Sequence, residues 1–203
     1  MKLYYSPGAC SLSPHIVSRE AGIPVELVKV DLKAHKTADG KDYYAINPRG
    51  YVPALELDDG TLLREGPALV QFLADQAPAT GLAPAAGTME RVHLQEWLTF
   101  IGTELHKTFS WLFNPNAPEE AKNIARDKIA ARLADVDGHL ASRPYLLGEH
   151  FTVADAYAFV VINWSGRMGI DLKPFPRVSA FLARVAARPK VREALIAEGL
   201  LKG

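Results

Sequence analysis

The run Ile46-Asn47-Pro48-Arg49-Gly50-Tyr51-Val52-Pro53-Ala54-Leu55-Glu56-Leu57 leads from a turn into a strand, and Pro53 stands where the strand begins. Proline has no N–H to donate, so it belongs at a strand start or a sheet edge, and an X-Pro bond is where a cis peptide is found. Val52 would then keep an outward-facing N–H and C=O that can pair with an extended peptide. An ordinary edge hairpin has the same local pattern, so both interpretations stay open here.

Beyond this strand the chain offers a second binding feature. The turn Asp58-Asp59-Gly60 predicts a hairpin between the strands 54–57 and 61–63. Pro67 then predicts the first position of a helix, which places Gly66 at its N-cap. Free N–H groups and the helix dipole attract a carboxylate there. A small peptide with a free carboxylate would use both the strand edge and this helix start.

The composition excludes several classes of function. The 203 residues are 48% hydrophobic and 23% charged, with 23 basic and 23 acidic residues. A net charge of zero offers no basic field for nucleic acid and no polybasic run for an anionic membrane. The first seven residues lack the apolar core of a signal peptide, and no apolar run is long enough to predict a membrane span. The single cysteine excludes an internal disulfide, so we expect a cytoplasmic protein.

The first half of the chain predicts a small α/β domain. Residues 2–5 and 25–30 are expected strands, with a helix between them that ends at Gly22. Such a strand–helix–strand unit is parallel and right-handed. Residues 33–45 are polar and expected to be irregular apart from a helical turn near Tyr43. The order is therefore βαβ followed by ββα, ending near residue 78.

The second half predicts helices only. Residues 79–87 are rich in Pro, Gly and Ala and are the expected linker. From residue 88 on, the apolar period is 3.6, so 88–203 is the expected all-α domain of five or more helices. The helix after residue 152 is apolar on all sides and should be central, and Thr152 with Asp155 forms a variant of the capping box.

Cys10 is the first candidate for chemistry. It lies at or just before the start of the first helix, where the dipole stabilises a thiolate. The motif Cys10-Ser11-Leu12-Ser13 lacks a second cysteine, so only a mixed disulfide with an external thiol is possible. The alternative is a small buried hydrophobic side chain. Tyr5 and Ser11 lie at the same corner, where either hydroxyl could donate to a substrate thiolate.

His106 is the second candidate. It repeats at spacings of three and four with Glu96, Thr99, Thr103 and Ser110, which predicts one polar helix face. Such a face is either solvated or lines a site. Histidine is the usual general base or donor near neutral pH. The six histidines have no spacing typical of a metal site, so no metal is expected.

Taken together, these motifs resemble the glutathione S-transferases, specifically the bacterial beta class, over essentially the whole chain. The resemblance rests on five segments, which follow one another at the family's spacing: 1–12, 47–55, 57–66, 104–107 and 151–157. It implies a thioredoxin-like N-terminal domain, an all-helical C-terminal domain and a homodimer.

The resemblance also implies a glutathione site. Val52 would pair with the cysteinyl main chain, with cis-Pro53 holding the geometry. Glu65 and Gly66 would bind the γ-glutamyl end, and Cys10 would lie beside the glutathione sulfur with His106 close by. The remaining implied glutathione contacts, some from the second subunit, are Tyr5, Ser11, His35, Tyr51, Thr99, Thr103, Glu104 and Lys107.

Three positions depart from the family pattern. Many relatives have Lys at position 35, Ser at 66 and Asn at 99, where this chain has His35, Gly66 and Thr99. Lys36 is an alternative contact for the glycyl carboxylate. Gly66 keeps a backbone N–H but has no hydroxyl, and Thr99 has no amide to donate. We therefore expect weaker glutathione binding than is usual in the family.

The main functional interpretation is a glutathione transferase, of the type EC 2.5.1.18, that joins glutathione as co-substrate to a small hydrophobic electrophile. Phe109, Trp111, Phe113 and Trp164 could supply the apolar wall for that electrophile. An alternative uses Cys10 as a nucleophile, in a thiol transferase, peroxidase or reductive dehalogenase. A third interpretation is a non-enzymatic binding module, against which Cys10, Glu65 and His106 argue together.

Overall fold

The structure, a computed structural model, describes residues 1–202. It divides the chain into two compact units, one of Met1–Leu82 joined by the chain from Arg188 on, and one of Ala83–Ala187. The boundary lies within the stretch 79–87. The chain beyond Arg188, however, does not lie with the helical unit to which the sequence assigned it.

The first unit is built on a five-stranded sheet, one strand more than the expected βαβ-ββα order contains. Its elements are β1 (Lys2–Tyr5), α1 (Leu12–Glu20), β2 (Glu26–Asp31), β3 (Lys36–Thr37), α2 (Tyr43–Ile46), β4 (Ala54–Glu56), β5 (Leu62–Arg64), α3 (Gly66–Asp75), the 3-10 turn η1 (Pro78–Thr80) and α9 (Pro189–Ala197). The strand order is β3-β2-β1-β4-β5. Strand β1 pairs parallel with β2 and antiparallel with β4. The sequence missed β3, because two residues cannot show a period-two pattern.

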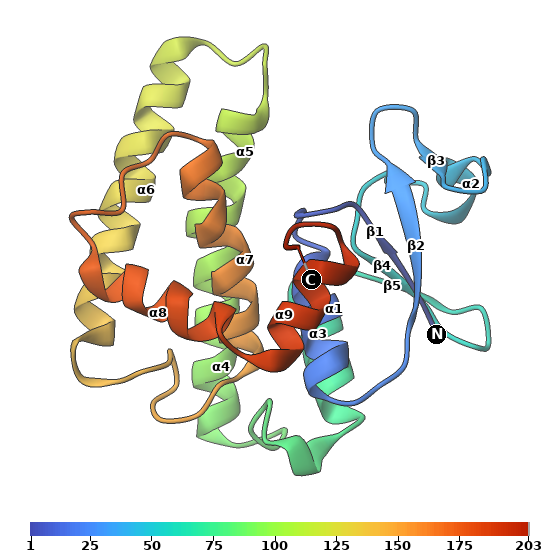
Figure 1. Ribbon diagram of the computed structural model, residues 1–203, viewed down its shortest axis with the longest axis horizontal. Helices are drawn as coiled ribbons and strands as arrows, with labels where there is room; N and C mark the ends of the chain where they lie inside the picture. The colour runs from blue at the N-terminus through green and yellow to red at the C-terminus, as the bar shows by residue number, and fades with distance from the viewer. Residues whose placement is uncertain (203) are drawn as a thin grey trace. The chain divides into compact units, whose positions relative to one another are not determined.

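Helices α1, α3 and α9 lie together on one side of the sheet (Figure 1). On the other face, Tyr43 of α2 packs against Tyr4 of β1 with ring centroids 5.5 Å apart. Val52 and Ala54 belong to the same buried cluster. Val52 and the start of β4 are therefore part of the hydrophobic core, so packing fixes their position without a ligand.

Helix α9 lies in the first unit because it bonds to α1. Arg188 donates two hydrogen bonds to Glu20, at 2.7 and 2.8 Å. Just beyond α9, Glu198 pairs with the buried His15, with 2.9 Å between the carboxylate oxygen and Nδ1. These contacts join residues more than 160 positions apart, which no periodicity in the sequence could indicate.

The second unit contains only helices. They are α4 (Met89–Phe100), the π-helical segment η2 (Ile101–His106), α5 (Lys107–Phe113), α6 (Glu119–His139), the 3-10 turn η3 (Leu140–Ser142), α7 (Val153–Arg167) and α8 (Pro176–Ala186). Twelve of the 15 residues of α7 are buried, and α7 packs against α4, η2 and α8. This confirms the expected central helix, which begins with the expected capping box at Thr152 and Asp155.

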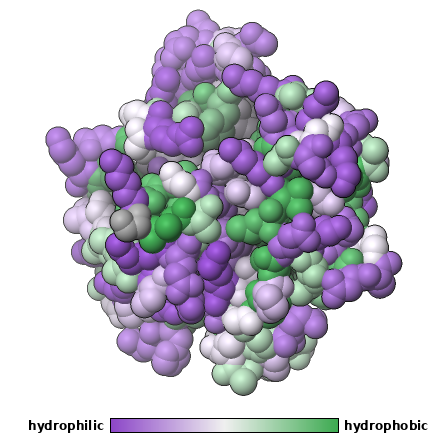
Figure 2. All heavy atoms as spheres, turned by 45° about the vertical axis from the view of Figure 1, so that its right-hand side comes forward, coloured by the Kyte–Doolittle hydropathy of each residue, from purple (hydrophilic) through white to green (hydrophobic). Residues whose placement is uncertain are grey.

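None of the helices within residues 1–202 is both long enough and apolar enough to cross a membrane. On the face drawn in Figure 2, apolar side chains form separate patches among hydrophilic ones. The equal numbers of acidic and basic residues give the chain a formal net charge of zero at pH 7.

Candidate active site

Two buried side chains fix the loop before β4 by hydrogen bonds to its backbone. The Tyr43 hydroxyl and the Asn47 amide both donate to the carbonyl oxygen of Tyr51, at 3.1 and 2.8 Å. The Tyr51 side chain itself is 55% exposed. The Val52–Pro53 peptide bond is cis, as the resemblance implies. Within residues 1–202, no group accepts a hydrogen bond from the Val52 N–H, so this donor is available to a ligand main chain.

Cys10 lies directly against this loop. Its thiol donates to the carbonyl oxygen of Val52, with 3.3 Å between sulfur and oxygen. Cys10 stands two residues before α1, close to the position expected. The structure does not support the expected reactive thiolate, however, because burial raises the pKa of Cys10 to about 12. Hydrogen bonds from the N–H groups of Cys10 and Ser11 lower the pKa by less than burial raises it.

The start of α3 differs from the expectation by one residue. Glu65, with a φ of 71°, is the N-cap, and Gly66 is the first helical residue. The N–H groups of Ala68 and Leu69 both donate to the carbonyl of Glu65, and Pro67 has none. Gly66 therefore supplies the one N–H at this helix start that no group in residues 1–202 accepts. The Glu65 carboxylate pairs with Arg49 at 2.7 Å, and both side chains are more than half exposed.

His35 lies near the same loop. Its Nδ1 is 3.1 Å from the carbonyl oxygen of Gly50, and its ring stacks on Tyr44 at 4.3 Å. A carbonyl only accepts hydrogen bonds, so Nδ1 carries the proton and Nε2 is left for other partners. Lys36, the alternative contact, is exposed on β3.

Tyr5 and Ser11 were the two hydroxyl residues near Cys10 expected to donate to a substrate thiolate, and Ser11 does not fit this role. It is fully buried, accepts from the N–H of Ser6 and donates to the carbonyl of Ser6. Its hydroxyl hydrogen is thus used to close the turn before α1. Tyr5 is 8% exposed, and burial, followed by the nearby Glu198, raises the pKa of its hydroxyl. Tyr5 therefore stays protonated and remains a possible donor.

The turn that carries Cys10 is also held by the end of the chain. Glu198 accepts a hydrogen bond from the N–H of Gly8, at 3.0 Å, with its second oxygen on His15. Arg19 donates to the other ring nitrogen of His15 at 2.9 Å. The sequence analysis missed Glu198, because nothing near residue 198 indicates a partner 190 positions earlier.

In the second unit, His106 ends the π-helical segment η2. Its Nδ1 lies 2.6 Å from the Tyr157 hydroxyl, and its ring packs edge-on against Trp164 at 5.0 Å. Burial, with a smaller effect of Lys107, lowers the pKa of His106 to about 4. The ring is therefore neutral at neutral pH. It is a poor general base there, but it can donate one hydrogen bond.

The π-helical turn also corrects the expected polar face. Thr99, Thr103 and Ser110 are exposed, whereas His106 is partly buried and faces Tyr157 of α7. A π turn has more residues than an α turn, so positions beyond it no longer follow the 3.6 period. The sequence reasoning assumed one unbroken helix and therefore placed His106 on one face with Thr99, Thr103 and Ser110.

The other candidates of this segment have partners of their own. The Thr103 hydroxyl donates to the carbonyl of Thr99 at 2.9 Å. Glu104 pairs with Arg132 and Lys128 of α6, at 2.9 and 3.3 Å. Hydrogen bonds from Arg132 and then Lys128 lower the pKa of Glu104. Glu104 thus joins η2 to α6, a role that the sequence did not predict, while Lys107 is exposed.

Aromatic side chains gather around His106 in the second unit. Phe109 is fully buried, Trp164 is 6% exposed and Phe113 is 43% exposed. The Phe113 and Trp164 rings meet edge-on at 5.2 Å. Trp111 is half exposed and lies outside this cluster. Of the four residues suggested as an apolar wall, Phe113 and Trp164 are the pair that combine ring contact with some exposure.

Within residues 1–202, no cluster of three or more His, Cys, Asp and Glu side chains is arranged to bind a metal ion.

The candidate residues that the sequence indicated fall into two groups. Cys10, Val52, Pro53, Glu65, Gly66 and His35 surround one loop of the first unit, and His106 lies with its aromatic neighbours in the second. Tyr157, the partner of His106, was visible in the 151–157 motif but was not recognised as a site residue.

Comparisons with known proteins identify the family. The model for the glutathione S-transferase N-terminal domain matches residues 8–76, and that for the C-terminal domain matches residues 100–189. Glutathione S-transferase GstA of Escherichia coli O157:H7 is 46% identical over 200 residues, covering 98% of this chain and 100% of the relative.

Solved structures agree with this result. A sphingomonad glutathione S-transferase complexed with glutathione is 48% identical, with a TM-score of 0.95, covering 99% of this chain and 100% of the other. A beta-class glutathione S-transferase of Sphingomonas chungbukensis is 46% identical, with a TM-score of 0.96 and the same coverage. The two matched domains, the shared fold and the full-length identity show that this chain belongs to the glutathione S-transferase family, among its bacterial beta-class members.

Proposed function

We propose that this protein is a glutathione transferase that binds glutathione along the Val52 edge of its first unit and joins the glutathione sulfur to a hydrophobic electrophile. Membership of the family and the similarity to a relative complexed with glutathione support this function. The observation that carries it is the 3.3 Å contact between the Cys10 thiol and the Val52 carbonyl. A peptide paired with Val52 would bring its own sulfur beside this thiol.

The two ends of glutathione would find complementary groups around the same loop. Gly66 offers an unpaired N–H at the start of α3, where the helix dipole favours a carboxylate. Glu65 carries the negative charge that the γ-glutamyl ammonium needs, and would exchange its contact with Arg49 for that group. His35 and Lys36 are the candidates for the glycyl carboxylate.

The chemical task is to keep the glutathione sulfur as a thiolate at neutral pH. A free thiol has a pKa near 8.5, and lowering it by two units takes about 2.7 kcal/mol. Hydrogen bonds to a charged group contribute about 1.5–3 kcal/mol each. The neutral Cys10 thiol, which lies against the Val52 loop, is a donor suited to this role. In the second unit, the neutral His106 ring can also donate one hydrogen bond, and Tyr157 would act as its positioning residue.

The neutral state of the Cys10 thiol argues against the alternative function, in which Cys10 acts as a nucleophile. A mixed disulfide at Cys10 requires a thiolate, and a pKa of about 12 leaves very little thiolate at neutral pH. Conjugation, in which Cys10 only donates a hydrogen bond, does not have this requirement. Thiol transfer, peroxidase and dehalogenase activity through Cys10 are therefore the less favoured functions.

We further propose a homodimer and a cytoplasmic location. Met89 and Val92 are 62% and 43% exposed on α4, and large exposed apolar side chains on one helix suit a partner surface. Thr99 and Thr103 are exposed on the same helical stretch and would serve as contacts from that second subunit. The single free cysteine is in keeping with a reducing compartment.

The test compares Cys10→Ala with Cys10→Ser in two assays, conjugation of glutathione to an aryl halide and reduction of a mixed disulfide. We expect Cys10→Ala to keep conjugation within about tenfold of the original rate, the loss of one hydrogen bond. Cys10→Ser restores a donor and should lie closer to the original protein. Loss of conjugation in both variants, together with strong thiol transfer by the original protein, would favour the nucleophilic Cys10.

A further inference from the structure

A cavity of about 380 Å³ lies within the second unit, between α4 and the segment that follows α6. We propose that it binds a small zwitterion with an aromatic body, such as a free aromatic amino acid. None of the residues proposed above for glutathione lines this cavity. Its volume falls in the range of small-molecule sites, roughly 300–1,000 Å³.

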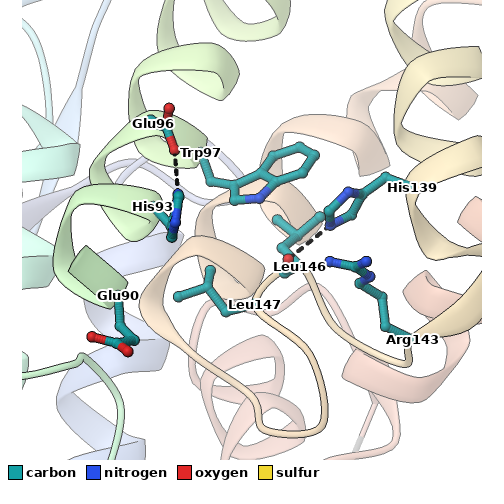
Figure 3. Close-up of a pocket in the computed structure, with 8 residues that line it drawn as sticks. All are labelled: Glu90, His93, Glu96, Trp97, His139, Arg143, Leu146 and Leu147. Carbon is teal, nitrogen blue, oxygen red and sulfur yellow. Dashed lines mark hydrogen bonds and ion pairs between the residues drawn. The ribbon is translucent and has the colours of Figure 1, made fainter.

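Opposite charges face this cavity from its two sides. Glu90 and Glu96 extend from α4, and Arg143 extends from the segment across from them (Figure 3). Within residues 1–202, neither the Glu90 carboxylate nor the Arg143 guanidinium has an ion-pair or hydrogen-bond partner. Two unpaired charges of opposite sign on one cavity suit a ligand that itself carries both signs.

The two carboxylates of α4 are not equivalent. Glu96 already accepts from Nδ1 of His93, at 2.6 Å (Figure 3). Glu90 is left as the carboxylate for a ligand ammonium, and Glu96 adds to the negative potential beside it. On the other side, the flat guanidinium of Arg143 suits a ligand carboxylate, which it can bind with two parallel hydrogen bonds.

Between the charges lies a fixed aromatic surface. The Trp97 indole packs against the His139 ring with centroids 4.4 Å apart, and His139 is itself held to the carbonyl of Leu146 at 2.8 Å. Leu147 adds an apolar side chain to the lining (Figure 3). No group in residues 1–202 accepts a hydrogen bond from the Trp97 indole. An aromatic ring can pack on such a surface, and stacking of this kind contributes about 0.5–1.5 kcal/mol.

Other ligand classes fit the cavity less well. A metal ion is disfavoured because no group of three suitable ligands exists among the described residues. Phosphate-bearing ligands would face the repulsion of Glu90 and Glu96. A wholly apolar ligand would leave the charges on both sides unused and partly desolvated. The zwitterion with an aromatic body is the one class that uses all three features.

The affinity should be modest, because Glu90 and Arg143 are exposed at the rim and exposed ion pairs are screened by water. We expect a dissociation constant on the order of 0.1–1 mM for L-phenylalanine. This ligand is the probe, and isothermal titration calorimetry on the full chain is the measurement. Phenylacetate lacks the ammonium and phenethylamine lacks the carboxylate, so each of these two probes should bind at least about tenfold more weakly.

Variants locate the binding. Arg143→Ala should weaken L-phenylalanine about tenfold or more and leave phenethylamine unchanged, while Glu90→Gln should weaken L-phenylalanine and leave phenylacetate unchanged. Glu120→Gln and Arg167→Ala are matched controls. Glu120 lies in the first turn of α6 as Glu90 does in α4, and neither control residue lines the cavity. Both controls should bind like the original protein.

Two results would overturn the proposal. One is the absence of any saturable heat with L-phenylalanine up to 10 mM, about ten times the weakest affinity expected. The other is binding that Arg143→Ala and Glu90→Gln leave unchanged, which would place the ligand elsewhere on the protein. All four substitutions are at exposed positions, so the melting temperature of each variant should match that of the original chain and verify that it folds.

Discussion

At the scale of single residues, burial determines the chemistry that Cys10 and His106 can perform. Burial raises the pKa of the Cys10 thiol to about 12 and lowers that of the His106 ring to about 4. In both cases the charged form is the one that burial disfavours. Both side chains are therefore neutral at neutral pH, and each can donate a hydrogen bond. For Cys10, which lies against the Val52 loop, this suits the stabilisation of a thiolate that belongs to a ligand.

His106 should make folding stability depend on pH. Its pKa is about 4 when folded and 6.5 as the ordinary value, so the unfolded chain takes up a proton first as the pH falls. Stability should then decrease between pH 6.5 and pH 4 by up to about 3 kcal/mol. The measurement is urea unfolding at several pH values for the original protein and for His106→Asn, in which this contribution is absent.

The difference in unfolding free energy between these two proteins isolates the His106 contribution. Asp155, whose pKa burial raises to about 6, acts in the opposite direction over part of the same range, but it is present in both proteins and cancels. The exposed His150 supplies a control variant, His150→Asn. A pH-independent difference between the original protein and His106→Asn would contradict the assigned burial effect.

The sequence could name candidate site residues, but it could not name their partners. Cys10, Val52 and His106 were candidates because each belongs to a local pattern of a few residues, and Glu65 was a candidate through the family resemblance. It could not indicate that the Ser11 hydroxyl bonds to Ser6, or that Arg49 pairs with Glu65. Such contacts depend on side-chain directions that become fixed only when the loops pack.

At the scale of elements, the pattern of apolar residues predicted which segments form helices and strands. The π-helical turn at 101–106 was beyond this reasoning, because a single wide turn changes the period for only a few residues. It has a clear consequence, since it lets His106 face Tyr157 of α7 instead of solvent. π-helical turns of this kind are frequent at functional sites.

The start of α7 offers a stability test. Asp155 accepts hydrogen bonds from both the N–H and the hydroxyl of Thr152, at 2.8 and 2.9 Å, and also from the N–H of Leu146. Thr152→Ala removes one of these bonds and should lower the unfolding free energy by about 1 kcal/mol. Urea denaturation measures this change, and Thr152→Ser, which keeps the hydroxyl, should be close to the original. Equal stability of the alanine and serine variants would show that the hydroxyl contributes nothing.

At the scale of the whole molecule, the two kinds of hydrophobic period predicted an α/β domain followed by helices, and the order of motifs predicted the family. The position of the last helix was missed. Helix α9 bonds through Arg188 to Glu20, and Glu198 beyond it bonds to His15 and Gly8. The end of the chain thus holds the turn before Cys10, a long-range contact that leaves no local signal in the sequence.

The central claim is that the loop around Val52, with the start of α3, binds glutathione. Titration calorimetry with glutathione in reducing buffer tests it most directly. We predict saturable heat and a higher melting temperature at millimolar glutathione, and a loss of about tenfold in affinity for Glu65→Gln, with Glu149→Gln as an exposed control. The account would be contradicted if millimolar glutathione produced no saturable heat and no gain in melting temperature.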